Sequence, residues 1–584
     1  MKVFALFLVV VVFSTAHGFV VVDHHPKRCA LGTATVLAAT RDLKDDEPPV
    51  EEQAQAQSVS WKRRAWSQLQ QVLWPGAQPD PHFSEPLPPG SLGCPFFGSE
   101  GFLSGNKVDG PGYFYRQQSA SEGHPTVVKF YFFGTPVASV SGAEWVKKLT
   151  AMEFSQTEAL SASFNDNEDG TTARGTAKED IPSVFGTDNI MFERNKKLHS
   201  FLRRLVGKGV STPAVKTYFK PLQQLVTNRF HDSQLLASSN NNNDNNNNAA
   251  ISMESFCHEY TLDVTQNLVL GLDLAPQEVA VFRQKLVTWL GALYSPLVTL
   301  VKTPWIVQHL PEYHARHYIQ DKIEAKIDAL LESGIPEDSV LSSMVFAVDD
   351  DENDTNDNNG TKRRLTRQQI VENSLLLIIT GSESSAGTLT LIMFLLGLHP
   401  DKYQKLVQEQ QSIIQQFGPE LTQDILENHC PYLNGVRKEA LRIGAVTGGY
   451  PKRAKGTILA DGVQIPKGWS VFCNIRLTHL LDPVARLSDN SHMCVFQGFQ
   501  PERWFSPETT PSDFMPYGSG PRRCFGKPLA NLQMQLFLAT LARNVQSFEL
   551  EKDYQGGKVP VEWYPSTITP RPSDGTMVKN VVTF

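Results

Sequence analysis

A single cysteine near the C-terminus lies in surroundings that could hold a metal cofactor. Cys524 belongs to residues 514–526, a run with three glycines, two prolines and two arginines directly before a predicted helix. Backbone N–H groups at the start of a helix and nearby arginines stabilise a thiolate, and glycine lets a flat partner approach the backbone. The pattern therefore predicts a thiolate that binds an anionic metallocofactor. A buried structural cysteine in a glycine-rich turn is the alternative.

Two charged pairs have the spacing that places both side chains on one helical face. Glu439 and Arg442 are three residues apart in a predicted helix at 431–443, and His199 and Arg203 are four apart in a basic segment. Side chains at these spacings contact each other on a helix, so each pair could act as a unit. For His199 and Arg203, a solvated basic helix face is the alternative.

An apolar segment at 375–398 contains polar residues at its centre. The segment is long enough to span a membrane, but Glu383 and its serine neighbours lie in the middle of it. An acidic side chain is costly in lipid. We therefore predict a buried helix, in which Gly381 and the hydroxyl groups open the backbone hydrogen-bond ladder and admit water.

The composition narrows the classes of protein. Of the 584 residues, 41% are hydrophobic and 20% are charged, so most of the chain can build a packed core. The formal net charge of −7 argues against a nucleic-acid partner. The seven cysteines include no CxxC pair, so neither a disulfide scaffold nor a zinc finger is the main architecture.

Hydrophobic periodicity predicts a fold that is mainly α with small β-sheets (α+β). Strands are expected at 126–133 and 137–140, with a strand-like run at 465–472, so that small sheets lie at both ends of the chain. Helical patterns cover residues 195 to the asparagine tract, 254–334, 375–398, 401–416, 431–443 and 527–544.

Residues 514–526 resemble the heme-binding loop of the cytochrome P-450 family, FxxGxRxCxG. Tyr517 takes the place of the usual phenylalanine, and Gly520, Arg522, Cys524 and Gly526 fall on the other positions. Three more segments resemble family motifs and stand in the family's order. They are 439–442 (ExxR), 501–504 (PERF, with Trp504 for Phe) and 380–385 ([A/G]Gx[D/E]T[T/S], with Thr380 and Ser384 substituted).

The resemblance runs from Pro88 to about Leu550 and implies one large catalytic domain around a buried heme b. The Cys524 thiolate would be the iron ligand. Glu439, Arg442 and Arg503 would form a structural network, and Glu383 and Ser384 would relay protons. The implied cofactor-binding residues are the ligand, the cations for the heme propionates and the loop residues near the ring: Cys524, Arg522, Arg453, His199, Arg203, Tyr517, Gly518, Gly520 and Gly526.

The resemblance implies a heme-thiolate monooxygenase that activates O2 with electrons from a redox partner and hydroxylates an apolar substrate. Segments at 90–93, 465–469 and 475–479 look most like the branch of retinoic-acid and plant steroid hydroxylases, which favours an isoprenoid, sterol or carotenoid substrate. One alternative is a heme-thiolate isomerase or dehydratase acting on hydroperoxides, although the acid–alcohol pair at 383–384 argues against it. The other is a non-enzymatic heme-binding sensor, although we recognise no output domain.

The composition of the N-terminal region indicates a targeting sequence rather than part of the folded domain. Residues 1–18 read as a signal-like segment, and 19–82 as a transit-like or disordered leader. Together they resemble the two-part plastid presequence of algae with complex plastids; an endoplasmic-reticulum or endomembrane location is the alternative. The catalytic domain would cover 83–584, with disordered inserts at 238–250 and 349–362.

The expected electron donor depends on that location. A plastid location implies ferredoxin, and an endomembrane location implies an NADPH-dependent flavoprotein reductase, with peripheral membrane association left open. Basic residues on the cysteine side of the heme would dock an acidic donor. They are Lys196, Lys197, Arg204, Lys208, Arg437, Lys438, Arg523 and Lys527.

Overall fold

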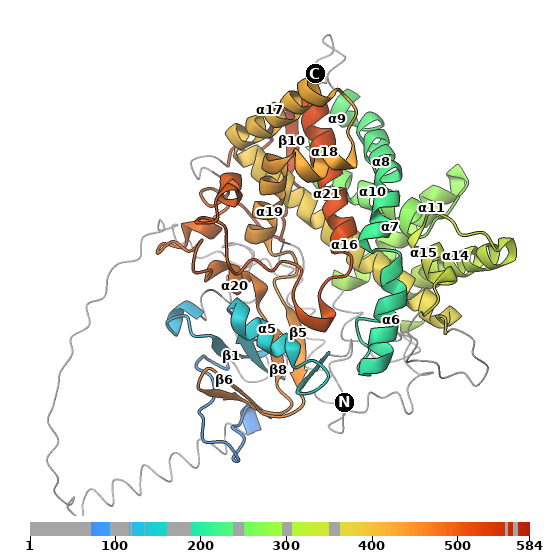
Figure 1. The fold of residues 1–584 in the computed structure, drawn as a ribbon. Helices are drawn as coiled ribbons and strands as arrows, with labels where there is room; N and C mark the ends of the chain where they lie inside the picture. Colours follow the sequence, from blue (N-terminus) through green and yellow to red (C-terminus); the bar gives the residue numbers. More distant parts are fainter. Residues whose placement is uncertain are drawn as a thin grey trace, which may run out of the picture. The chain divides into compact units, whose positions relative to one another are not determined.

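The computed structural model describes residues 72–93, 116, 119–132, 135–159, 189–237, 250–294, 307–349, 363–554, 559–564 and 570–584 (Figure 1). All of them belong to one unit, Val59–Phe584. The signal-like segment, nearly all of the leader, and residues 238–249 and 350–362 of the two inserts lie outside the described residues.

The longest helix, α16 (Arg367–Leu398), runs through the helical part of the fold (Figure 1). A capping box starts it, because Thr366 accepts from the Gln369 N–H and the Gln369 side chain bonds back to Thr366. By length and composition alone α16 could cross a membrane, but 72% of its most apolar window is buried inside the protein. A helix that is apolar on all sides and buried is a core helix, as the sequence predicts.

The remaining helices pack around α16 or extend the fold. Direct neighbours of α16 include α10 (Met253–Val264), α19 (Pro431–Gly444) and α21 (Lys527–Asn544). A π-helix at Thr265–Val269 continues α10. The other helices are α5 (Ala143–Ala151), α6 (Lys196–Lys208), α7 (Thr212–Thr217), α8 (Phe219–His231), α9 (Gln234–Ala237), α11 (Pro276–Leu290), α14 (Pro311–Ser333), α15 (Val340–Phe346), α17 (Pro400–Phe417), α18 (Gln423–Asn428) and α20 (Ile475–Leu480).

The main sheet joins strands from distant parts of the chain. Its order is β1-β2-β8-β5-β3, in which β2 and β8 are parallel and the other pairs antiparallel. Two smaller sheets pair β4 with β10 and β9, and β6 with β7. The strands are β1 (Val127–Phe132), β2 (Thr135–Val140), β3 (Thr157–Ala159), β4 (Ile251–Ser252), β5 (Tyr450–Ala454), β6 (Ile458–Ala460), β7 (Val463–Ile465), β8 (Ser470–Cys473), β9 (Val545–Leu550) and β10 (Met577–Thr583).

The structure corrects four sequence expectations. The run at 465–472 is two strands, β7 and β8, because the turn at 466–469 separates them. The strands expected at the two ends of the chain share the main sheet. Part of the assigned leader packs into the domain, since Ala77 is buried and the Trp469 indole donates to the Gly76 carbonyl at 2.8 Å. Asp349 is likewise buried rather than part of a disordered insert.

Candidate active site

The cysteine loop, residues 514–526, makes tight turns immediately before α21. The Cys524 N–H donates to the Tyr517 carbonyl at 2.9 Å and closes the loop. Gly518 and Gly520 have φ of 68° and 69°, which L side chains rarely adopt. A Cβ at Gly520 would also lie 2.8 Å from the Thr150 Cβ. The loop therefore requires glycine at 520, both for its conformation and for its close approach to α5.

The Cys524 sulfur faces a cavity while protein surrounds it. Its residue is accessible from the cavity, yet burial raises the pKa of its thiol. The backbone N–H groups of Gly526 and Lys527, with the charge of Arg203, only partly oppose this effect. We expected the loop alone to favour a thiolate, but burial raises the pKa of the thiol more than the N–H groups and Arg203 lower it. A metal cation bound to the sulfur would stabilise the thiolate against this effect.

The cavity beside Cys524 has an apolar wall and a cationic rim. Its lining comes mainly from α6, α10, the π-helix, α16, β5, α21 and the cysteine loop, and apolar side chains predominate. The lining residues that carry a positive charge or an imidazole ring are His199, Arg203, Lys452, Arg522 and Arg523. Such a rim suits a flat apolar group with anionic substituents.

A buried carboxylate holds two of these cations in place. Glu153 is buried and forms ion pairs with Lys452 and, at 2.5 Å, with the Arg522 Nε. Burial, followed by the charges of Arg522 and Arg203, lowers the pKa of His199 to about 4. His199 is therefore neutral at pH 7 and can offer the rim a hydrogen bond but no charge.

In strand β5 the cation at the cavity is Lys452 and not the predicted Arg453, which is the next residue. Successive side chains of a strand point to opposite faces, and it is Lys452 that is buried and lines the cavity. Arg453 is not among the lining residues. The sequence analysis chose Arg453 by residue type, whereas the register of β5 places Lys452 at the rim.

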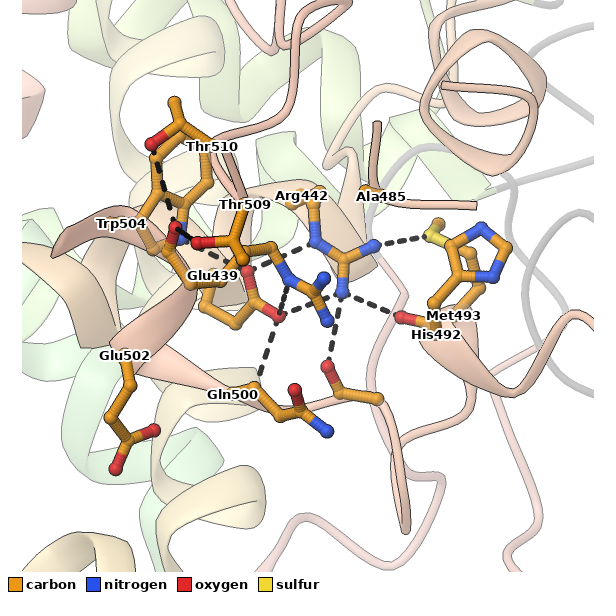
Figure 2. A network of polar contacts seen from close by, with 12 residues as sticks. Glu439, Arg442, Ala485, His492, Met493, Gln500, Glu502, Trp504, Thr509 and Thr510 are labelled. Atoms are coloured by element: carbon orange, nitrogen blue, oxygen red, sulfur yellow. Dashed lines mark hydrogen bonds and ion pairs between the residues drawn. The ribbon is translucent and has the colours of Figure 1, made fainter. Parts of the chain in front are cut away.

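The Glu439–Arg442 pair is fully buried and forms the centre of a polar network (Figure 2). Arg442 donates to both Glu439 oxygens at 2.8 and 3.0 Å, and its guanidinium also reaches the His492 and Gly498 carbonyls. Arg503 lies 3.3 Å from Glu439, so the structure brings together all three residues that the sequence grouped.

Trp504 completes this network, and the sequence analysis missed its role. Its indole N–H donates to Glu439 at 3.0 Å, as Figure 2 shows. The substitution of Trp for Phe in the 501–504 motif was the available signal, because a buried indole N–H usually has an acceptor.

His479 connects the network to the cysteine loop. Its Nδ1 lies 3.0 Å from the Arg442 carbonyl, and its Nε2 accepts from the Met515 N–H at 3.0 Å. These two contacts assign the proton to Nδ1. The ring is also stacked on Phe514. A change in the position of α19 would therefore reach the loop through a single buried ring.

Tyr517 makes a contact that phenylalanine could not. Its hydroxyl donates to the Asn531 side-chain oxygen at 2.5 Å, and Arg437 donates to the same oxygen at 2.6 Å. Arg437 is also buried, so it is not part of the basic docking surface to which the sequence assigned it. Lys438 is half-buried, with its ammonium 5.3 Å from the centre of the Trp504 ring.

The polar centre of α16 is arranged differently from the expectation. The helix is continuous, and the Ser384 hydroxyl donates to the Thr380 carbonyl at 2.5 Å. Thr380, Gly381 and Ser385 line the cavity, whereas Glu383 and Ser384 are not lining residues. The Glu383 carboxylate instead lies 3.5 Å from His258 and 3.8 Å from Arg571.

The side chains at the site determine which kind of metal centre it could hold. Among the described residues, no group of three or more His, Cys, Asp or Glu side chains could hold a metal ion. One thiol, a glycine-lined approach and a cationic rim fit a metal that arrives within its own anionic macrocycle. The fold and the site therefore define a heme-thiolate protein.

Comparison with known proteins gives the same result. The family model "Cytochrome P450" matches residues 88–574, so the chain belongs to the cytochrome P450 family. Cytochrome P450 26A1 of Danio rerio is 24% identical over 477 residues, which cover 80% of this chain and 86% of the relative. The 7,8-epoxymelianol synthase CYP88A51 of Citrus sinensis is 31% identical over 201 residues, 34% of this chain and 38% of the relative.

A solved structure shares the fold. "Retinoic acid bound cyanobacterial CYP120A1" aligns with a TM-score of 0.65 and 23% identity, covering 86% of this chain and all of that one. The mixed α+β P450 fold predicted from the sequence is confirmed. Membership of the family makes the protein a P450-type monooxygenase with a b-type heme, which uses O2, an apolar substrate and electrons from a redox partner.

Proposed function

We propose that this P450 hydroxylates an apolar isoprenoid, such as a retinoid, sterol or carotenoid. The observation that carries the proposal is the apolar wall of the cavity beside Cys524. Two comparisons support the substrate class: one similar structure contains retinoic acid, and one relative is a synthase of 7,8-epoxymelianol.

The side chains of the cavity would each contribute to holding the cofactor. Cys524 would bind the heme iron, and heme would supply the O2-activating chemistry. Lys452, Arg522 and Arg203 would pair with the propionates, and His199 would add a neutral hydrogen-bonding partner. Gly518, Gly520 and Gly526 would keep the loop backbone close to the ring. The apolar wall would exclude water and orient the substrate.

Proton delivery would start at Glu383 and pass along α16. Ser384 remains the proposed alcohol partner of Glu383, with its hydroxyl held by the Thr380 carbonyl. Ser385 is the neighbouring hydroxyl residue that lines the cavity, so it would be the exit of the same relay. Both hydroxyls can accept and donate a proton.

The electron donor would be a ferredoxin that docks on exposed lysines and arginines. Lys196 and Lys197 begin α6, and Arg523 and Lys527 flank the cysteine; all four are exposed. Arg204 contributes less, because it is paired with Asp349 at 2.7 Å. Relatives from Drosophila melanogaster with 32% identity over 171 residues are named mitochondrial, which supports a ferredoxin rather than a flavoprotein donor. They match only 28% of this chain.

Docking can be tested by salt and by charge reversal. Reconstituted turnover should fall as ionic strength rises, because screening weakens charge steering. Lys196→Glu and Arg523→Glu should each raise the apparent KM for ferredoxin, whereas Lys467→Glu, in an exposed turn between β7 and β8, should not. Turnover that only a flavoprotein reductase supports would contradict the ferredoxin proposal.

The plastid location is proposed from the leader. A fluorescent fusion of residues 1–60 should enter the plastid of an alga with complex plastids. Retention of the fusion in the endoplasmic reticulum would contradict the location and leave the docking surface unaffected.

The substrate class is tested by ligand binding to the purified heme protein. All-trans retinoic acid, β-carotene and a plant sterol are titrated while the heme absorption is recorded, with a short-chain fatty acid as control. An isoprenoid should displace axial water and shift the spectrum at micromolar concentration. A shift with the fatty acid and none with the isoprenoids would overturn the substrate class. Conversion of a hydroperoxide without O2 or reductant would instead favour the isomerase.

A further inference from the structure

Four ionisable side chains from three separate segments meet at Glu383. His258 and Glu254 lie on α10, Glu383 lies on α16, and Arg571 belongs to a C-terminal segment, 571–573, that pairs antiparallel with 562–564. His258 Nδ1 lies 3.5 Å from a Glu383 oxygen, and the Arg571 guanidinium lies 3.8 Å from the other oxygen. Glu254 lies 2.7 Å from Arg571 and 4.0 Å from His258 Nε2. No residue of this cluster except Glu383 was singled out by the sequence analysis.

The cluster joins a buried carboxylate to solvent. The side chain of Glu383 is 8% exposed and that of Arg571 is 5% exposed, whereas those of His258 and Glu254 are each 23% exposed. Glu383 is on the same helical turn as Gly381 and Ser385, which line the cavity. His258 is therefore the more exposed partner of a nearly buried carboxylate that lies on the same helical turn as two cavity-lining residues.

The charges of the cluster leave room for one mobile proton. Counting these four side chains, two carboxylates face one permanent cation, so they carry one net negative charge when His258 is neutral and none when His258 is protonated. Burial lowers the pKa of His258, and Arg571 adds to this effect, while Glu383 and Glu254 oppose it. The two carboxylates therefore favour the protonated imidazole that burial disfavours.

We propose that His258 passes protons from solvent to Glu383, while Arg571 and Glu254 hold the pair in position. The proton on Nδ1 of the imidazolium moves to a Glu383 oxygen, which leaves a neutral imidazole and a protonated carboxyl. A flip of the ring then presents the vacant nitrogen to water, from which it takes the next proton. The proposal rests on the proton role of Glu383 in the proposed function and adds the source of the protons.

The alternative explanation of this cluster is purely structural: its ion pairs would fix the C-terminal segment to α10. The Arg571–Glu254 pair holds the segment 570–576 against α10, and the Glu254 N–H also donates to the Gly575 carbonyl. If His258 served only this structural role, its replacement would change stability but not proton delivery. The experiment must therefore measure a proton-dependent quantity.

The experiment compares His258→Gln, Glu383→Gln, the double variant and the control His231→Gln at the exposed end of α8. Glutamine keeps a hydrogen-bonding side chain at 258 but cannot carry a proton. O2 consumption by the heme-loaded full chain, saturated with a plant-type ferredoxin and its reductase, is measured from pH 5.5 to 8 in H2O and in D2O. His258→Gln should slow O2 consumption about tenfold, flatten its pH profile and change its solvent isotope effect. The double variant should be no slower than Glu383→Gln.

Nuclear magnetic resonance of His258 gives a second readout that does not depend on turnover. Removing the Glu383 charge should lower the pKa of His258, because the neighbouring carboxylate favours the imidazolium. If Glu383→Gln slows O2 consumption and His258→Gln does not, or if Glu383→Gln leaves the His258 pKa unchanged, the relay is overturned and the role of Glu383 stands. If Glu383→Gln has no effect on O2 consumption or its isotope effect, the proton role in the proposed function fails instead.

Discussion

Glu439→Gln removes one charge from the buried network without changing the size of the side chain. Both Glu439 and Arg442 have no exposed side-chain surface. Glu439 accepts hydrogen bonds from Arg442, the Gln500 N–H, Arg503 and Trp504. The amide would keep one acceptor oxygen, but it would leave the Arg442 cation without a counterion.

The expected cost follows from this uncompensated charge. Breaking a buried ion pair by removing one partner destabilises a protein by roughly 3–5 kcal/mol. Carbonyl oxygens of His492 and Gly498 still accept from Arg442, so the lower end, about 3 kcal/mol, is expected. Against a total stability of about 5–15 kcal/mol, this loss is large. His479 would transmit the distortion to the cysteine loop, so heme retention should fall as well.

The assay is urea unfolding together with the ratio of heme to protein after purification. Glu502→Gln is the matched control, because Glu502 is next to Arg503 in the 3-10 segment Pro501–Phe505 but is 35% exposed and pairs with Lys402 and Lys405. An exposed pair contributes about 0–1 kcal/mol, so the control should stay heme-loaded. A fully heme-loaded Glu439→Gln variant within about 1 kcal/mol of the control would refute the scaffold role.

Three further predictions concern the cations that would hold heme, the stability of the fold at acidic pH, and the proton relay along α16. Lys452→Met should lower the heme content of the purified protein more than Arg453→Met, because only Lys452 lines the cavity; equal losses would contradict the register argument. Burial lowers the pKa of His479 to about 4 from 6.5. A lowered folded-state pKa stabilises the fold above 6.5, so up to about 3 kcal/mol should be lost as the pH falls from 6.5 to 4. His479→Gln should be less stable at neutral pH and should unfold with a shallower pH dependence over that range. Ser384→Ala should leave the heme spectrum intact and release more peroxide per NADPH consumed, and if only Ser385→Ala does so, the relay passes through Ser385.

The sequence predicted helices best where the signal was long and had clear ends. The helix expected at 527–544 is α21 itself, and the helix expected at 431–443 differs from α19 by one residue. Proline at the first turn defines the start of α19, and a lysine followed by proline starts α21. The pairing of β2 with β8 was not predictable, because their contact joins segments about 330 residues apart.

Site residues could be predicted from the sequence where a motif requires particular residue types. They could not be predicted where only the folded geometry shows which of two adjacent residues faces the cavity. Glycines with positive φ and the cysteine are legible because few residues can replace them. Lys452 and Arg453 differ by one residue of strand register, which residue type alone does not resolve. The contact between Glu383 and His258 joins α16 to α10, and no local pattern in the sequence encodes it.

The most direct test of the account is the iron ligand. Cys524→Ser is compared with Cys494→Ser, which changes a partly exposed cysteine away from the cavity. The dithionite-reduced, carbon-monoxide-treated proteins are examined by absorption spectroscopy, because a thiolate ligand gives carbon-monoxide complexes a distinctive band. The wild type and Cys494→Ser should both show the thiolate band, and Cys524→Ser should lack it. A Cys524→Ser protein that keeps the band at the wild-type position would contradict the assignment of Cys524 as the heme ligand.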